Sequence, residues 1–143
     1  MPTANIIVED DICSNNGALT VSPGKPAGSL PDDRKFALRT VTGFLLLKRS
    51  EVVYFQYNDD LRSWQVHLTE NRVYRLRTCI TAKNILNISV SFFQANQFII
   101  VNVDHLALID TQLHCTFHLP YNDINVTISR RYFHKLKESL EII

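Results

Sequence analysis

Side chains that can read nucleic-acid bases occur in three expected loops of this chain. Arg62 lies in a polar loop between two strands, Asn96 and Gln97 precede an apolar strand, and Arg130 and Arg131 stand at the start of a terminal helix. A guanidinium matches the two acceptors of guanine in the major groove, and a carboxamide matches the acceptor and donor of adenine. The arginines also attract phosphates. These residue types in these places predict contacts with double-stranded DNA.

Two lysines could add to such an interface. Lys48 ends an expected strand, and Lys135 lies about one turn beyond Arg131 on the terminal helix. Both would attract the DNA backbone without reading its sequence. We expect a DNA-binding domain to bring these lysines and the arginines onto one face.

The sequence offers little that could carry catalysis. It has no P-loop and no GxGxxG, HExxH or nucleophile-elbow motif. His114 and His118 share one face of an expected strand but would lie about 13 Å apart, too far to share one metal ion. Cys13, Cys79 and Cys115 form no CxxC pair and are expected to be reduced thiols. No enzyme activity, cofactor, metal ion or small-molecule substrate is therefore expected.

Length, composition and charge fit one globular domain behind a short leader. The chain has 143 residues, of which 45% are hydrophobic and 20% charged, a globular composition. Residues 1–33 carry one basic and five acidic side chains, whereas the rest of the chain carries 14 basic and 9 acidic ones. The compact part therefore has a net charge of +5, which suits a polyanionic partner.

Membrane and export signals are not visible. No apolar run approaches the roughly 20 residues that span a bilayer. The first residues also lack the basic and apolar regions of a signal peptide. A cytoplasmic protein without a membrane partner is expected.

Proline and glycine divide the chain. Four of the five prolines and three of the four glycines precede Phe36, so residues 1–34 are expected to be a flexible acidic leader, with a short strand at 5–8 as an option. Residues 35–143 show short apolar runs rich in β-branched and aromatic residues, which predict a mostly β domain. The expected strands are residues 35–40, 44–48, 51–57, 64–69, 73–77, 98–102, 105–110, 115–119 and 125–128.

Two helices complete the expected elements. Residues 80–88 have helical spacing of apolar residues, with Thr78 as a candidate cap. The chain then ends in a helix from Arg130 to about residue 141, for which Ser129 is a good N-cap. The apolar stripe expected on this last helix consists of Tyr132, Phe133, Leu136, Leu140 and Ile143.

The order of these motifs resembles the LytTR family, the DNA-binding domain of many bacterial response regulators in two-component systems. Residues 92–105 read FFQANQFIIVNVDH, and residues 128–133 read ISRRYF. The Val-Asn pair at 101–102 and the Ser-Arg-Arg-Tyr run at 129–132 carry most of the resemblance, which extends over about residues 36–140.

The resemblance implies elongated, stacked antiparallel β-sheets and a sequence-specific regulator of transcription. In this family, loops enter successive major grooves of the DNA. By position, the contacts would fall on Arg62 in the hairpin loop, on Asn96 and Gln97 in the central loop, and on Arg131 with Arg130 beside it in the last loop. A second copy on direct-repeat sites would be a further partner.

The central loop departs from the family pattern and leaves an alternative open. Most members carry His-Arg where this chain has Asn96-Gln97, so a positive charge is missing there. The alternative is a protein-interaction domain on the same fold, with weakened or lost DNA binding.

Overall fold

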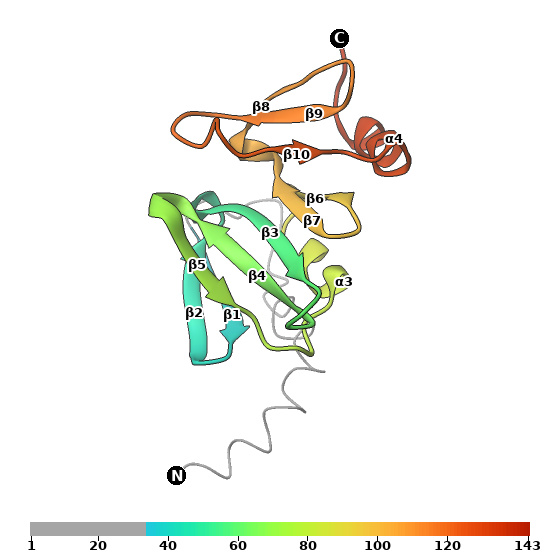
Figure 1. Cartoon of the computed structure of the whole chain (residues 1–143). Coiled ribbons are helices and arrows are strands. Elements are labelled where there is room, and N and C mark those ends of the chain that lie inside the picture. The colour runs from blue at the N-terminus through green and yellow to red at the C-terminus, as the bar shows by residue number, and fades with distance from the viewer. Residues whose placement is uncertain (1–33) are drawn as a thin grey trace, which may run out of the picture.

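The computed structural model describes residues 34–143, which form stacked antiparallel sheets and two helices (Figure 1). The expected fold class, mostly β with one short and one C-terminal helix, is confirmed. Residues 1–33, with nearly all of the expected leader and the optional strand at 5–8, lie outside the described part.

The strands form three separate sheets. A hairpin of β1 (Lys35–Thr40) and β2 (Gly43–Lys48) lies beside a five-stranded sheet with the order β5-β4-β3-β7-β6, and a third sheet has the order β10-β9-β8. The five-stranded sheet consists of β3 (Val52–Asn58), β4 (Ser63–Leu68), β5 (Arg72–Arg75), β6 (Phe92–Asn96) and β7 (Ile99–Asn102). The third sheet consists of β8 (Leu106–Ile109), β9 (His114–Phe117) and β10 (Val126–Thr127). Short 3-10 turns cover Arg49–Glu51, Thr69–Asn71 and Val103–His105.

The five-stranded sheet separates two hydrophobic cores. Successive side chains of a strand point to opposite faces, so a strand buried on both faces is apolar at nearly every position. On β3, Phe55 packs into one core and its neighbour Tyr54 packs against the other. The first core is closed by the β1–β2 hairpin and the helix α3 (Ala82–Leu86), and the second by β8, β9, β10 and the helix α4 (Arg130–Ser139) (Figure 1).

The C-terminal helix begins where the sequence predicts. The Ser129 hydroxyl accepts a hydrogen bond from the Tyr132 N–H at 3.3 Å, which confirms Ser129 as the N-cap. The expected apolar stripe is too long, however. Leu136 is buried, but Leu140 already has extended backbone and is exposed, as is Ile143, because the helix ends at Ser139.

The helix α3 is shorter than predicted, and Thr78 does not cap it. Its N-cap is Thr81, whose hydroxyl accepts from the Asn84 N–H at 3.2 Å, while the Asn84 side chain accepts from the Thr81 N–H at 2.9 Å. This reciprocal pair places the N-cap three residues later than expected, and the helix starts at Ala82 instead of residue 80.

The sequence did not predict the strand β6. The strand β6 is an edge strand with a register shift between Gln94 and Asn96, so its alternation of polar and apolar residues is broken. The expected strands 64–69 and 73–77 are joined by a 3-10 turn over Thr69–Asn71, in which Glu70 and Asn71 have φ of 65° and 58°.

The cysteines differ from one another. Cys115 is a buried free thiol, and burial, together with Asp110, raises its pKa to about 11. The expectation of a reduced thiol is wrong for Cys79, which is disulfide-bonded. Neither α3 nor α4, the helices of the described part, is long and apolar enough to cross a membrane.

Candidate nucleic-acid interface

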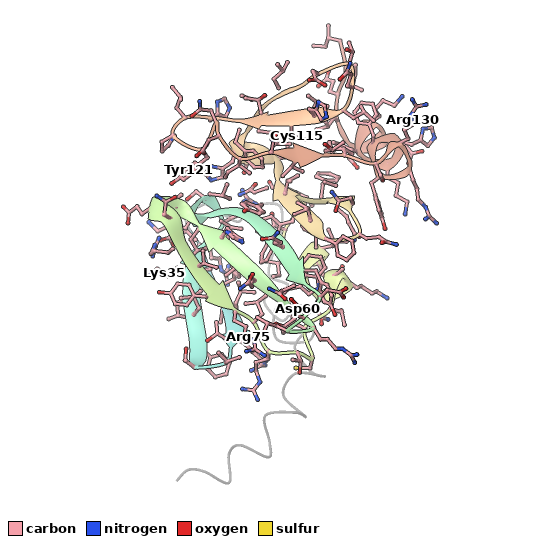
Figure 2. All side chains as sticks on the ribbon, viewed as in Figure 1. Lys35, Asp60, Arg75, Cys115, Tyr121 and Arg130 are labelled. Atoms are coloured by element: carbon pink, nitrogen blue, oxygen red, sulfur yellow. The ribbon has the colours of Figure 1, made fainter. Side chains whose placement is uncertain are left out.

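Three chain junctions lie along one side of the molecule. In the view of Figure 1, the β3–β4 turn, the β6–β7 turn and the helix α4 all lie on the right-hand side. Figure 2 labels Asp60 near the lower end of this side and Arg130 near its upper end. These are the three places where the sequence predicted base-reading side chains.

The β3–β4 turn covers residues 59–62 and presents Arg62. The Asn58 side chain accepts a hydrogen bond from the Leu61 N–H at 3.0 Å, which stabilises the turn as Asn commonly does. Arg62 closes the turn with a left-handed φ of 53°. Its side chain is exposed, and it forms no ion pair with any described residue. Asp59 and Asp60, which precede it, are exposed as well.

The β6–β7 turn gives Asn96 and Gln97 different surroundings. Asn96 is the last residue of β6 and not part of a loop. Its Oδ1 accepts from the Phe98 N–H at 2.9 Å, and its Nδ2 donates to the Thr127 carbonyl at 2.9 Å. Gln97 is exposed at the turn and hydrogen-bonds to no described residue. Gln97 is therefore the carboxamide available to an outside partner.

The junction of β10 with α4 presents the basic residues of the third region. The Ser129 N–H donates to the Ala95 carbonyl at 2.8 Å and so places the start of α4 beside β6. Arg130 and Arg131 are exposed in the first turn of the helix, where the helix dipole adds positive potential. Lys135 is exposed one turn later, with its Nζ 5.9 Å from the centre of the Tyr132 ring.

Phe98 joins the first junction to the second. Its carbonyl accepts from the Tyr57 N–H at 2.7 Å, and its ring stacks on the Tyr57 ring with centroids 6.3 Å apart. Tyr57 also packs against Trp64, with centroids 5.4 Å apart, and both flank the β3–β4 turn. No local pattern predicts this role of Phe98, because its partner Tyr57 lies about 40 residues away on another hairpin. Together with the hydrogen bond from Ser129 to Ala95, these contacts hold all three junctions in fixed positions relative to one another.

Lys48 is the one candidate that the structure separates from the others. It pairs with Lys35 at the far end of the β1–β2 hairpin, and Figure 2 labels Lys35 on the left, away from Asp60 and Arg130. The register of the hairpin places Lys48 beside Lys35, at the end of the hairpin away from its own turn, and a contact of Lys48 with DNA stays a prediction. Arg62, Gln97, Arg130, Arg131 and Lys135 remain on the three junctions.

The charge at these junctions is available to a ligand. Arg62, Arg130, Arg131 and Lys135 form no ion pair with any described residue, whereas Arg72 pairs with Glu51 at 3.5 Å and Arg49 with Asp104 at 3.9 Å. Exposed cations without carboxylate partners attract polyanions such as DNA.

A model of the LytTr DNA-binding domain matches residues 42–141. The chain belongs to the LytTR family. The matched residues include all three junctions, and the family is one of DNA-binding domains, not of enzymes, with DNA as its partner. No curated protein sequence matches the chain.

A solved structure supports the assignment of the LytTR fold. It is the LytTr DNA-binding domain of a protein described as a methyl-accepting/DNA response regulator, from Bacillus cereus. The two chains are 20% identical and superpose with a TM-score of 0.58, over 76% of this chain and 97% of the other. At this identity the likeness concerns the fold.

Proposed function

We propose that this LytTR domain is a sequence-specific regulator of transcription that binds double-stranded DNA with its three junctions in successive major grooves. The proposal rests on the contacts that hold the three junctions together. Hydrogen bonds of Asn96, Phe98 and Ser129 hold the junctions in fixed relation on one side of the molecule. A fixed spacing between reading side chains is what recognition of a fixed DNA sequence needs.

The residues of the interface divide by role. Arg62 and Arg131 are the proposed base contacts, because an exposed guanidinium can fork onto guanine. Gln97 is the proposed adenine contact, whereas Asn96 positions the turn with both ends of its carboxamide. Arg130 and Lys135 are proposed to bind phosphates and so to contribute affinity without sequence preference.

The setting of this activity is part of the same proposal. A LytTR domain with DNA as partner fits a bacterial response pathway in the cytoplasm. A second copy bound to a direct-repeat site would double the number of contacts, and it would explain how a small domain reaches useful specificity.

Selection from a random pool of duplexes with the full chain tests the proposal. We expect an enriched motif in two or more short blocks, one for each junction that enters a groove. Binding to the selected duplex should weaken with salt by about 0.9 in log–log slope for each phosphate contacted. A pool without enrichment, together with a flat salt dependence, would contradict the proposal.

A protein-interaction domain on the same fold is the second candidate. It is favoured by the neutral Gln97 in the central turn and by the exposed Asp59 and Asp60 beside Arg62, which repel phosphates. This candidate predicts that the domain binds no DNA duplex with useful affinity or preference, even at low salt. The same selection experiment therefore separates the two.

A further inference from the structure

The β1–β2 hairpin has an apolar outer face that is largely exposed. Phe44 and Leu46 are 61% and 60% exposed. They point away from the core, because the residues that alternate with them, Leu45 and Leu47, pack into it. Ala37 pairs with Leu46 and is exposed on the same outer face. We call Phe44, Leu46 and Ala37 the hairpin patch.

The strand that carries most of this patch is also an edge strand. Among the described strands only β1 pairs with β2, so the backbone groups along the other side of β2 point away from the sheet. An exposed apolar edge invites pairing with another chain, and native proteins usually cover it or place charges on it. The charge on β2 stands only at its end, where Lys48 is exposed opposite Lys35. The middle of β2 therefore calls for a cover.

The start of the chain contains a segment with suitable composition. Residues 5–11 read NIIVEDD, which is three β-branched apolar residues followed by three acids. Such apolar residues favour strands, and the acids are opposite in charge to Lys35 and Lys48. The segment lies outside the described residues, but the described part begins at Arg34, directly before β1.

A parallel alignment of this segment with β2 matches residue types at every second position. Side chains at alternate positions of a strand share a face, so positions 6, 8 and 10 would lie beside positions 44, 46 and 48. The matched pairs are Ile6 with Phe44, Val8 with Leu46, and Asp10 with Lys48. An antiparallel alignment over the same patch would instead place Asp10 at the hairpin turn, away from both lysines. The charges therefore favour the parallel alignment.

The rest of the leader is long enough to make this connection. In the parallel alignment, residue 11 would lie at the Lys48 end of β2, and β1 begins at the same end of the hairpin. The two ends would be two strand spacings apart, which is about 10 Å. Residues 12–33 can extend over about 70 Å, at about 3.3 Å for each residue. The connection therefore imposes no strain.

We propose that residues 5–11 dock on the free edge of β2 as an added parallel strand, with Ile6 and Val8 on the hairpin patch and Asp10 beside Lys48. Backbone hydrogen bonds supply the affinity, and the side-chain pairs set the register. Docking covers the apolar edge and so prevents a second copy of the chain from pairing with it. The three junctions take no part, so this inference does not depend on DNA binding.

Amide hydrogen exchange of the full chain, followed by NMR for single residues, tests the docking. Ile6→Ser and Val8→Ser remove apolar contacts of the leader without changing any described residue, so the domain itself stays folded. We expect the outward-pointing amides of β2 to exchange about tenfold faster in each variant. Ile12→Ser is the matched control, because it makes the same change just beyond the aligned segment. It should leave the exchange of β2 at the wild-type rate.

A charge exchange between Asp10 and Lys48 tests the register. Asp10→Lys alone and Lys48→Asp alone each place like charges side by side and should speed the exchange of β2. The two changes together restore an opposite pair and should recover most of the protection. The effect of each single change should shrink at high salt, because the pair is exposed.

Four results would overturn the inference. The first is outward-pointing amides of β2 that already exchange in the wild type as fast as unpaired ones. The second is exchange that Ile6→Ser and Val8→Ser leave unchanged. The third is protection that rises with protein concentration and persists in both of these variants, which would assign the edge to a second copy. The fourth is a double charge variant that recovers no protection.

Discussion

Asn96 and Thr127 join two hairpin systems that are 31 residues apart in the sequence, through a hydrogen bond of 2.9 Å from the Asn96 Nδ2 to the Thr127 carbonyl. The same carboxamide accepts from the Phe98 N–H. Asn96 thereby holds the β6–β7 turn in shape and also fastens it beside the start of α4. The side chain that the sequence offered as a base reader is instead part of the support for its neighbours.

Asn96→Ala and Gln97→Ala should therefore have different effects. Asn96→Ala removes two hydrogen bonds that position the turn, so we expect unfolding to become easier by about 1 kcal/mol and specific DNA binding to weaken. Gln97→Ala should leave stability unchanged and reduce only the preference at the base it contacts. Urea denaturation and binding to single-base variants of the selected duplex measure the two effects. Equal loss of stability in both variants would contradict the assignment.

Arg131→Ala should weaken specific binding without destabilising the fold. The side chain is exposed, and the packing of α4 rests on Leu136. The loss should be about 1–3 kcal/mol if the guanidinium forks onto a base. Lys137→Ala is the control, because it removes one charge from a different side of the same helix. A domain unfolded by Arg131→Ala would show that the arginine is a structural residue instead.

The sequence predicted the junctions well because their signals are local. Ser129 before two arginines marks a helix start, and the polar residues 58–63 mark a hairpin turn. Residue types alone therefore located Arg62, Gln97 and Arg131 on turns and ends of elements. The stacking of the sheets was predicted only from the resemblance to the LytTR family, because composition and spacing do not indicate how sheets pack.

The remaining features depend on pairings between distant residues. Neither the hydrogen bond from Asn96 to Thr127 nor the backbone hydrogen bond from Arg77 to Arg39 can be predicted from a periodic pattern in the sequence. The edge strand β6 escaped detection because a register shift breaks its alternation. Lys48 was chosen for its charge alone, and its position beside Lys35 follows only from the register of the hairpin.

Arg62 occupies a backbone conformation that suits glycine better. At a φ of 53° a side chain costs roughly 1 kcal/mol, so Arg62→Gly should stabilise the domain slightly while removing the guanidinium. Arg62→Ala should lose a similar amount of DNA affinity without the gain in stability. Thermal melting and DNA titration of both variants check this. If Arg62→Gly binds as tightly as the wild type, the β3–β4 turn does not read DNA through this residue.

Asn102 is expected to be the most sensitive polar residue of the core. It is fully buried, its Nδ2 donates to the Val52 and Arg49 carbonyls at 2.8 and 3.1 Å, and its Oδ1 accepts from the Asp104 N–H at 3.0 Å. Asn102→Ala leaves these groups unpaired and should lower the free energy of unfolding by about 2–3 kcal/mol. The exposed Asn125, changed to Ala, is the control for urea denaturation. If Asn102→Ala and Asn125→Ala unfold at the same urea concentration, the hydrogen bonds of Asn102 contribute no net stability.

His67 should make the domain less stable in mild acid. It stacks on Tyr54 with ring centroids 4.2 Å apart, and burial lowers its pKa in the folded state. As the pH falls below the ordinary histidine value of about 6.5, the unfolded chain takes up a proton that the folded domain resists. The contribution of His67 to the free energy of unfolding is therefore complete above about pH 6.5 and is lost on acidification towards the folded pKa.

In His67→Gln, the decrease in unfolding free energy between about pH 7 and pH 5.5 should be smaller than in the wild type. Glu51 and Asp110 have lowered pKa values and lose their contributions only at more acidic pH, outside this window. An identical pH dependence in the wild type and His67→Gln would show that the imidazole is solvated well enough to titrate normally.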